Sequence, residues 1–154
     1  MSKDVRAALL DVELPAEPRS VTRARQAVMN ALRGIAVDRD AVGLVVSEAV
    51  TNAVLHAYRD RSRPGTVHVS AALDEDGVQL AVDDDGLGMR PRLDSPGVGL
   101  GLPLITDLAD RVEVSSREPG THVAARFALM GAAGPHGRPL ARHGRAEQRL
   151  AALL

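Results

Sequence analysis

The stretch LVVSEAVTNAVLHAY, residues 44–58, carries a polar stripe within an apolar segment. Glu48, Asn52 and His56 recur every four residues, which places their side chains on one face of an α-helix. Two hydroxyl side chains adjoin this stripe: Ser47 and Thr51. Burying an unpartnered neutral polar group costs about 2–7 kcal/mol, and burying a carboxylate costs more. The stretch therefore predicts a core helix whose polar face meets a ligand or another polar partner.

The composition predicts one ordinary globular domain. The chain has 154 residues, of which 45% are hydrophobic and 25% charged, and its formal net charge is −1. This charge, and the presence of only two aromatic residues, Tyr58 and Phe127, argue against a direct nucleic-acid partner. Without cysteine, with charges in the first apolar stretch and with no long apolar run, we expect a cytoplasmic protein that does not contact a membrane.

Lysine usage narrows the ways in which the chain could hold a nucleotide. Lys3 is the only lysine, and the sequence contains no GxxxxGK[ST] run. A nucleotide would therefore be bound without a P-loop lysine.

Apolar patterning and turn residues predict the order strand, helix, helix, strand, strand, loop, helix, strand, strand. The expected strands are 5–14, 66–74, 78–85 and a hairpin within 112–130; the expected helices are 20–33, the helix containing 44–58, and 102–111. Ser20 or Thr22 is predicted to cap the first helix and Asp38 or Asp40 the second. We predict an α+β two-layer sandwich, a mixed β-sheet covered on one face by helices.

Two regions are expected along the chain. Residues 1–130 form the folded domain, and residues 131–154 form a flexible basic tail that is rich in glycine, proline and arginine.

The segment AVDDDGLGM, residues 81–89, places carboxylates at the end of a predicted strand. Gly86 and Gly88 allow a tight turn and a close approach of the backbone to a flat ligand. Asp84 can accept a hydrogen bond from an exocyclic amine, the interaction that distinguishes adenine from guanine. Taken alone, such a segment is more often an acidic surface turn than a ligand site.

A second glycine cluster precedes the last predicted helix. In PGVGLGLPLITDL, residues 96–108, Gly97, Gly99 and Gly101 alternate, so that backbone N–H groups can converge on phosphate oxygens near a helix N-terminus. A Rossmann turn is disfavoured because the preceding strand lies too far away and no βα alternation follows. Thr121, in the late hairpin, is either a β-branched strand residue or a ligand contact.

The order of these motifs over residues 5–130 resembles the GHKL (Bergerat-fold, histidine-kinase-like) ATPases. Within that superfamily SEAVTNAVLHAY, residues 47–58, is most similar to the serine-kinase anti-sigma factors of bacterial sporulation and stress response. The resemblance implies ATP and Mg²⁺ as cofactors. It also implies that Glu48 is the general base, that Asn52 coordinates Mg²⁺ and that Asp84 reads adenine.

The same resemblance assigns further residues. The remaining implied ATP contacts are Gly86, Gly88, Gly97, Gly99, Gly101, Leu102 and Thr121, with residues 89–96 as a short lid. His56 either approaches the phosphates or is a structural histidine. Arg25 falls near the partner-contacting arginine of the family, or is an ordinary solvated arginine on a helix.

The implied function is an ATP-dependent serine kinase that phosphorylates an anti-anti-sigma factor and otherwise sequesters a sigma factor, acting as a homodimer. Two alternatives remain: a non-catalytic module that binds nucleotide or a partner, and a stand-alone histidine-kinase ATPase domain. The short lid and the lack of an upstream phospho-acceptor helical pair argue against the histidine kinase.

Overall fold

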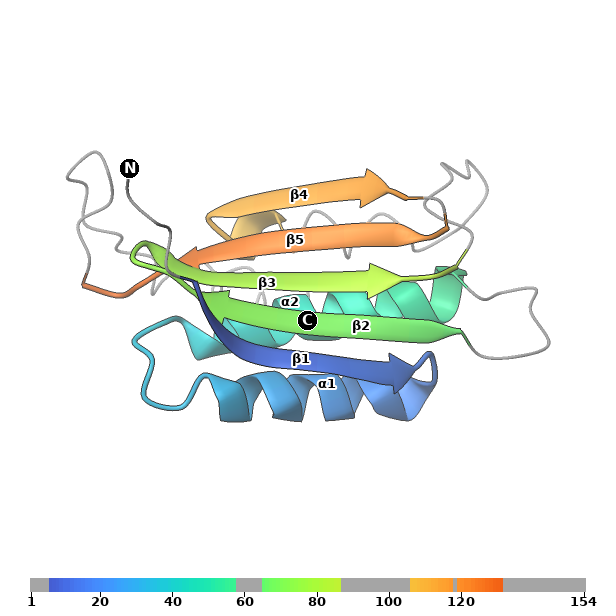
Figure 1. Ribbon diagram of the computed structural model, residues 1–154, viewed down its shortest axis with the longest axis horizontal. Coiled ribbons are helices and arrows are strands. Elements are labelled where there is room, and N and C mark those ends of the chain that lie inside the picture. Colours follow the sequence, from blue (N-terminus) through green and yellow to red (C-terminus); the bar gives the residue numbers. More distant parts are fainter. Residues whose placement is uncertain (1–5, 58–64, 87–105, 118, 132–154) are drawn as a thin grey trace, which may run out of the picture.

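The computed structural model describes residues 6–57, 65–86, 106–117 and 119–131. In these ranges one sheet is covered on one face by helices, so the predicted two-layer α+β sandwich is confirmed (Figure 1). The sheet has the order β1-β2-β3-β5-β4. Its strands are β1 (Ala7–Pro15), β2 (Thr66–Leu73), β3 (Gly77–Asp84), β4 (Arg111–Ser116) and β5 (Thr121–Ala128).

The prediction of a mixed sheet is wrong, because every strand pair in the described part of the chain is antiparallel. Two helices connect β1 to β2, and the second helix turns the chain back, so β2 runs opposite to β1. β3 and β4 run in the same direction, but β5 lies between them and separates them (Figure 1). A single helix between two neighbouring strands would make them parallel. Two helices between β1 and β2, and β5 between β3 and β4, leave no parallel neighbours among the described strands.

The two main helices are α1 (Pro18–Ala31) and α2 (Arg39–Asn52). The predicted Asp38 cap is confirmed, since its carboxylate accepts a hydrogen bond from the Ala41 N–H at 3.0 Å. The predicted cap at Ser20 or Thr22 is wrong, because α1 begins after Glu17 with Pro18 in its first turn, so both residues lie inside the helix. The Ser20 hydroxyl instead donates to the Pro15 carbonyl at 2.5 Å. No helix in the described ranges is long and apolar enough to cross a membrane.

The core lies between the sheet and the helices. Alternate residues of the three central strands face it, which is the two-residue period of a strand. The fully buried larger side chains are Val28 of α1 and Leu32 at its C-cap, Val42, Val45, Val46 and Val50 of α2, and Val67, Val69, Val78 and Leu80 of the sheet. Valine predominates, so the core is built from small branched side chains.

The helix that contains the opening stretch changes its winding near its end. α2 ends at Asn52, and residues Ala53–Ala57 form a π-helix, η1. The third predicted helix, residues 102–111, lies partly outside the described residues, which begin again at 106. Residues 106–108 are helical, and β4 begins at Arg111. The predicted tail falls almost wholly outside the described residues as well.

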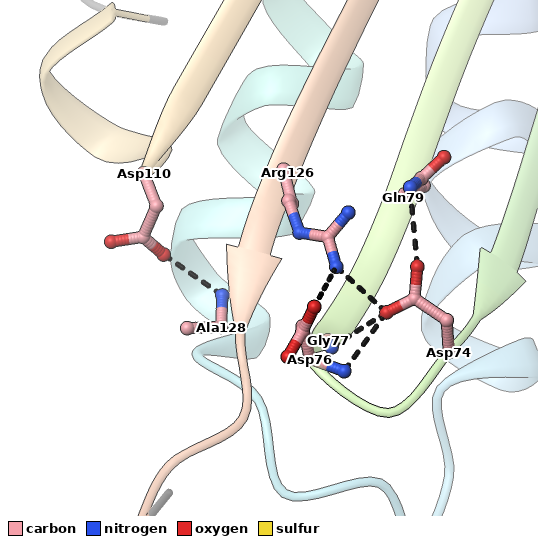
Figure 2. Close-up of polar contacts among 7 residues, drawn as sticks. All are labelled: Asp74, Asp76, Gly77, Gln79, Asp110, Arg126 and Ala128. Carbon is pink, nitrogen blue, oxygen red and sulfur yellow. Dashed lines mark hydrogen bonds and ion pairs between the residues drawn. The ribbon is translucent and has the colours of Figure 1, made fainter. Parts of the chain in front are cut away.

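The two ends of the sheet are held by different groups. Figure 2 shows the end at the β2–β3 turn, where the Asp74 carboxylate accepts bonds from the backbone N–H groups of Asp76 and Gly77 and from the Arg126 guanidinium at 2.8 Å. The Gln79 amide adds a bond to Asp74 at 3.2 Å. This side-chain cluster joins the turn to β5. The opposite end of the sheet carries the motif residues.

Candidate functional site

Three elements that carry motif residues meet at one end of the sheet. β3 ends at Asp84, β5 begins at Thr121 and α2 ends at Asn52, all toward the right-hand end in Figure 1. α2 packs against β3 and β5. Segments distant in sequence are therefore brought to one end of the domain, as the resemblance requires.

Asp84 is the last residue of β3, and its side chain is half-buried on the helix-facing side of the sheet. Its carboxylate accepts hydrogen bonds from the backbone N–H groups of Gly86, at 3.0 Å, and Thr121. Burial raises the pKa of Asp84 above its ordinary value, although these two bonds act in the opposite direction. A partly desolvated carboxylate held by backbone donors is a well-oriented acceptor for one further donor.

Gly120 shapes the turn that delivers Thr121 to this carboxylate. Its φ of +105° is one that L-residues rarely adopt, and a Cβ there would lie 1.7 Å from the Asp84 carbonyl oxygen. Only glycine fits this close approach. Gly86, on the other side of Asp84, is buried, and Thr121 is 7% exposed.

Glu48 and Asn52 lie one helical turn apart on α2, near its C-terminal end, and both are half-buried. The desolvation cost expected from full burial is therefore only partly incurred. Ser47, which adjoins them in sequence, does not belong with them: its hydroxyl donates to the Gly43 carbonyl at 2.9 Å and lines a separate groove against α1. The polar stripe is thus divided between two surfaces of the helix.

His56 was expected to continue the stripe four residues after Asn52. The π-helical winding of η1 has more residues per turn than an α-helix, so the four-residue spacing no longer keeps the backbone positions of Asn52 and His56 in line. The expectation for the histidine side chain lies outside the described residues.

The second glycine cluster, Gly97, Gly99 and Gly101, lies outside the described residues, as does Leu102. The same applies to Gly88 of the first motif and to the predicted lid, residues 89–96. The described part of the site consists of Glu48, Asn52, Asp84, Gly86 and Thr121.

Arg25 lies on the exposed side of α1, close to a glycine of α2. Its guanidinium lies over Gly43, where a Cβ would meet the Arg25 Nε at 3.3 Å. The open groove beside it is lined by Val21, Thr22, Arg25, Gln26, Met29, Asn30 and Ser47. The sequence did not predict this groove; the signal for it is a glycine within a helix of otherwise bulkier residues.

A polar network on the open face of the sheet was also missed. Asp83 points away from the helices and contacts His122 Nδ1 at 2.6 Å, Arg117 Nη1 at 3.5 Å and His68 Nδ1 at 3.9 Å. His68 also contacts Asp11 at 2.7 Å. Asp83 and His122 each adjoin a motif residue, Asp84 or Thr121, in a predicted strand. Strand alternation could therefore have indicated that Asp83 and His122 share the face of the sheet opposite to the motif residues.

Comparison with known proteins agrees with this arrangement of elements. The family model of the histidine kinase-like ATPase domain matches residues 14–127. The chain belongs to this family. Over 106 residues it is 37% identical to an anti-sigma F factor of Heyndrickxia coagulans, which covers 55% of the chain and 70% of that protein. An anti-sigma F factor of Bacillus thuringiensis (strain Al Hakam) is 36% identical over 87 residues, or 48% of the chain and 58% of that protein.

Solved structures support the same family fold. The structure of the RsbU and RsbW domains of Rv1364c from Mycobacterium tuberculosis has a TM-score of 0.60 at 22% identity, covering 78% of this chain and 32% of that one. The histidine kinase domain of the blue-light activated kinase EL346 from Erythrobacter litoralis has a TM-score of 0.52 at 26% identity, covering 75% and 62%. The first of these likenesses concerns the fold alone.

Proposed function

We propose that this histidine kinase-like ATPase domain is an ATP-dependent serine kinase of the anti-sigma factor type. It would phosphorylate a serine of an anti-anti-sigma factor and, in the absence of that partner, hold a sigma factor. The observation that carries the proposal is the convergence of Glu48, Asn52 and Asp84 at one end of the sheet in a chain whose relatives are named anti-sigma F factors.

Asp84 fits the base end of an adenine nucleotide. Its carboxylate is anchored by the Gly86 and Thr121 N–H groups, so its direction is set before any ligand arrives. An ionised carboxylate only accepts hydrogen bonds, so it favours the exocyclic amine of adenine over the carbonyl oxygen of guanine. The buried Gly86 leaves no side chain beside this acceptor, which suits the flat face of a base.

Glu48 and Asn52 fit the phosphate end. A side-chain amide oxygen is a hard ligand of the kind that Mg²⁺ accepts, so Asn52 would hold the metal. Glu48, one turn earlier, would accept the proton of the attacking serine hydroxyl. When bound, Mg²⁺-ATP supplies the phosphoryl group and the charge neutralisation for its transfer. The chain's own contribution is to orient these groups and to hold the proton acceptor in a partly desolvated position.

Arg25 and the groove beside it are the proposed partner surface. Arg25 is exposed, and its guanidinium lies over Gly43, so the charge is held at a defined place beside the groove. An exposed arginine at the edge of a groove suits a carboxylate on the partner protein. We also propose that the active form is a homodimer.

Phosphate transfer tests the catalytic part of this proposal. The protein is incubated with γ-labelled ATP, Mg²⁺ and each anti-anti-sigma protein of the source organism. We expect one of them to be labelled on serine. Glu48→Gln, which keeps the shape of the side chain but removes the base, should abolish the labelling while ATP still binds.

The remaining outcomes separate the alternatives. ATP binding without transfer to any of these partners would favour a non-catalytic module of the same fold. Labelling of a histidine instead of a serine would favour a histidine-kinase ATPase domain. If Asp84→Asn leaves ATP affinity unchanged, the assignment of the adenine subsite is wrong.

A further inference from the structure

The proposed adenine subsite lies at the last rung of the sheet. In the β3–β5 ladder the final pair is Asp84 with Thr121, and in the β2–β3 ladder it is Val67 with Asp84. The ends of regular elements open locally at little free-energy cost, because few neighbours hold them. A residue that must present its carboxylate in one direction therefore needs support from beyond the ladder.

The residue before Asp84 provides such support on the open face of the sheet. Asp83 stands opposite His122 in the ladder, one rung inside the Asp84–Thr121 pair, and their side chains are 2.6 Å apart. Both side chains are largely shielded, with exposures of 27% and 19%. Arg117, in the β4–β5 connection, contacts the same Asp83 oxygen at 3.5 Å. A cross-strand pair at this rung resists separation of β3 from β5.

The residue after Asp84 provides support toward the other neighbouring strand. The register that pairs Val67 with Asp84 would next place Thr66 opposite Asp85, but the backbone ladder ends there. Instead the Asp85 carboxylate accepts the Thr66 backbone N–H at 3.0 Å. A side chain thus continues the pairing of β2 with β3 by one position beyond the ladder.

We infer that Asp83 and Asp85 are positioning residues of the adenine subsite, which hold Asp84 from its two flanks. Asp83 fixes β5 through His122, and Asp85 fixes β2 through the Thr66 N–H. Asp83 precedes Asp84 in β3 and so points to the opposite face of the sheet, whereas Asp85 follows the end of β3 and its carboxylate accepts the Thr66 N–H. Both residues can therefore restrain the backbone without entering the subsite. This inference rests on the proposed function for the role of Asp84, whereas the restraint itself does not require a nucleotide.

The restraint is measured first on the nucleotide-free protein by amide hydrogen exchange. In Asp83→Ala the Thr121 amide should exchange about 3- to 10-fold faster than in the wild type, the factor expected for the loss of one side-chain hydrogen bond. The double variant Asp83→Ala/His122→Ala should exchange no faster than Asp83→Ala, because the two side chains act as a pair. In Asp85→Ala the Gly86 amide should show the same acceleration.

The role in base reading is measured as the ratio of ATP to GTP affinity. Asp83→Ala and Asp85→Ala should each lower this ratio by about 3- to 10-fold. Asp85→Asn keeps an oxygen that can accept the Thr66 N–H, so it should retain most of the wild-type ratio. An equal loss in the Asn and Ala variants would mean that the charge of Asp85, not its hydrogen bond, affects the nucleotide, and would overturn the assignment of Asp85.

Asp74→Ala is the matched control. Asp74 is a similar hydrogen-bonded aspartate at the opposite end of the same sheet, where Figure 2 shows its contacts. This variant should lower the melting temperature but leave the ATP-to-GTP ratio unchanged. If the ratio falls equally in Asp74→Ala, the effects of Asp83 and Asp85 are general consequences of lost stability and the inference fails.

The two proposals fail in different ways. A wild type that prefers ATP, with flank variants of unchanged ratio or unchanged exchange, overturns this inference and leaves the proposed function standing. A wild type that binds neither nucleotide overturns the proposed function, and with it the base-reading role of the flanking aspartates, even where the exchange rates behave as expected.

Discussion

Replacing Gly120 by alanine tests the close approach of the β4–β5 turn to the end of β3. The new methyl group would lie 1.7 Å from the Asp84 carbonyl oxygen and 2.6 Å from its carbon, far inside contact distance. The neighbour is backbone and not the end of a flexible side chain, so one of the two strands must move. The displaced group belongs to Asp84 itself.

The expected loss of stability has two parts. A non-glycine residue at a φ of +105° carries a strain of about 1–3 kcal/mol. Forcing an extra methyl into a filled space adds about 1–3 kcal/mol. A combined loss of about 2–6 kcal/mol lowers the melting temperature of a 154-residue chain by about 4–24 °C.

The assay combines thermal unfolding with equilibrium binding of ATP at a temperature where all variants are folded. Gly77→Ala is the matched control, because a Cβ there would lie 2.1 Å from the Phe127 carbonyl oxygen, at the opposite end of β3. Both variants should melt at lower temperature. Gly120→Ala alone should weaken ATP binding, by at least about 10-fold, since a loss of about 1.4 kcal/mol in binding free energy suffices for that factor.

Two results would refute this reasoning. If Gly120→Ala melts within about 1 °C of the wild type, the turn accommodates the methyl group and the close approach does not restrict the position. If the two variants bind ATP equally well, the turn at Gly120 has no special relation to the nucleotide subsite.

Three further predictions concern the carboxylates and the core. Burial raises the pKa of Asp84 in the folded protein above its ordinary value of about 3.9. The free energy of unfolding therefore falls as the pH rises from about 3.9 through the raised native pKa, because the buried carboxyl must ionise. Asp84→Asn should therefore melt at or above the wild-type temperature at pH 7, with no such advantage near pH 3, in a fluorimetric melting series over pH; a lower melting temperature at pH 7 would contradict this. Asp38→Ala removes the α2 cap and should cost about 1 kcal/mol in urea unfolding, whereas an unchanged midpoint would show that the cap is dispensable. Leu80→Ala, at a site 2% exposed, should cost about 2–5 kcal/mol in the same assay, and a loss below 1 kcal/mol would mean that the core closes around the cavity.

Local patterns were sufficient to predict most of the elements. The alternation in 66–74 and 78–85 and the turn residues between them match the β2–β3 hairpin, whose strands are Thr66–Leu73 and Gly77–Asp84. Asp38 was a correct cap because an aspartate before an apolar helical run acts over three residues of chain. Strand alternation and helix caps depend only on residues that are close in sequence, so they can be predicted from the sequence.

The errors arose where contacts outside the pattern of a single helix or strand decide the outcome. Serine is a residue type that often caps helices, but the Ser20 hydroxyl donates to the Pro15 carbonyl, and the residue is fully buried. The direction of each strand pair followed from the paired helices between β1 and β2 and from the insertion of β5 between β3 and β4. Neither can be read from periodicity, because periodicity does not specify which strands are neighbours.

The sequence alone was sufficient to propose the candidate site residues: the acid and amide on one helix, and the Asp84 turn with its glycine. It could do so because short motifs of particular residue types recur in a fixed order, and that order resembles a known family. Tertiary structure alone decided how those residues are supported. It divided the polar stripe of α2 between two surfaces, and it placed Asp83 against His122 and Asp85 against Thr66, across strands 39 and 19 residues apart in the chain. These contacts depend on register, which only the packed sheet defines.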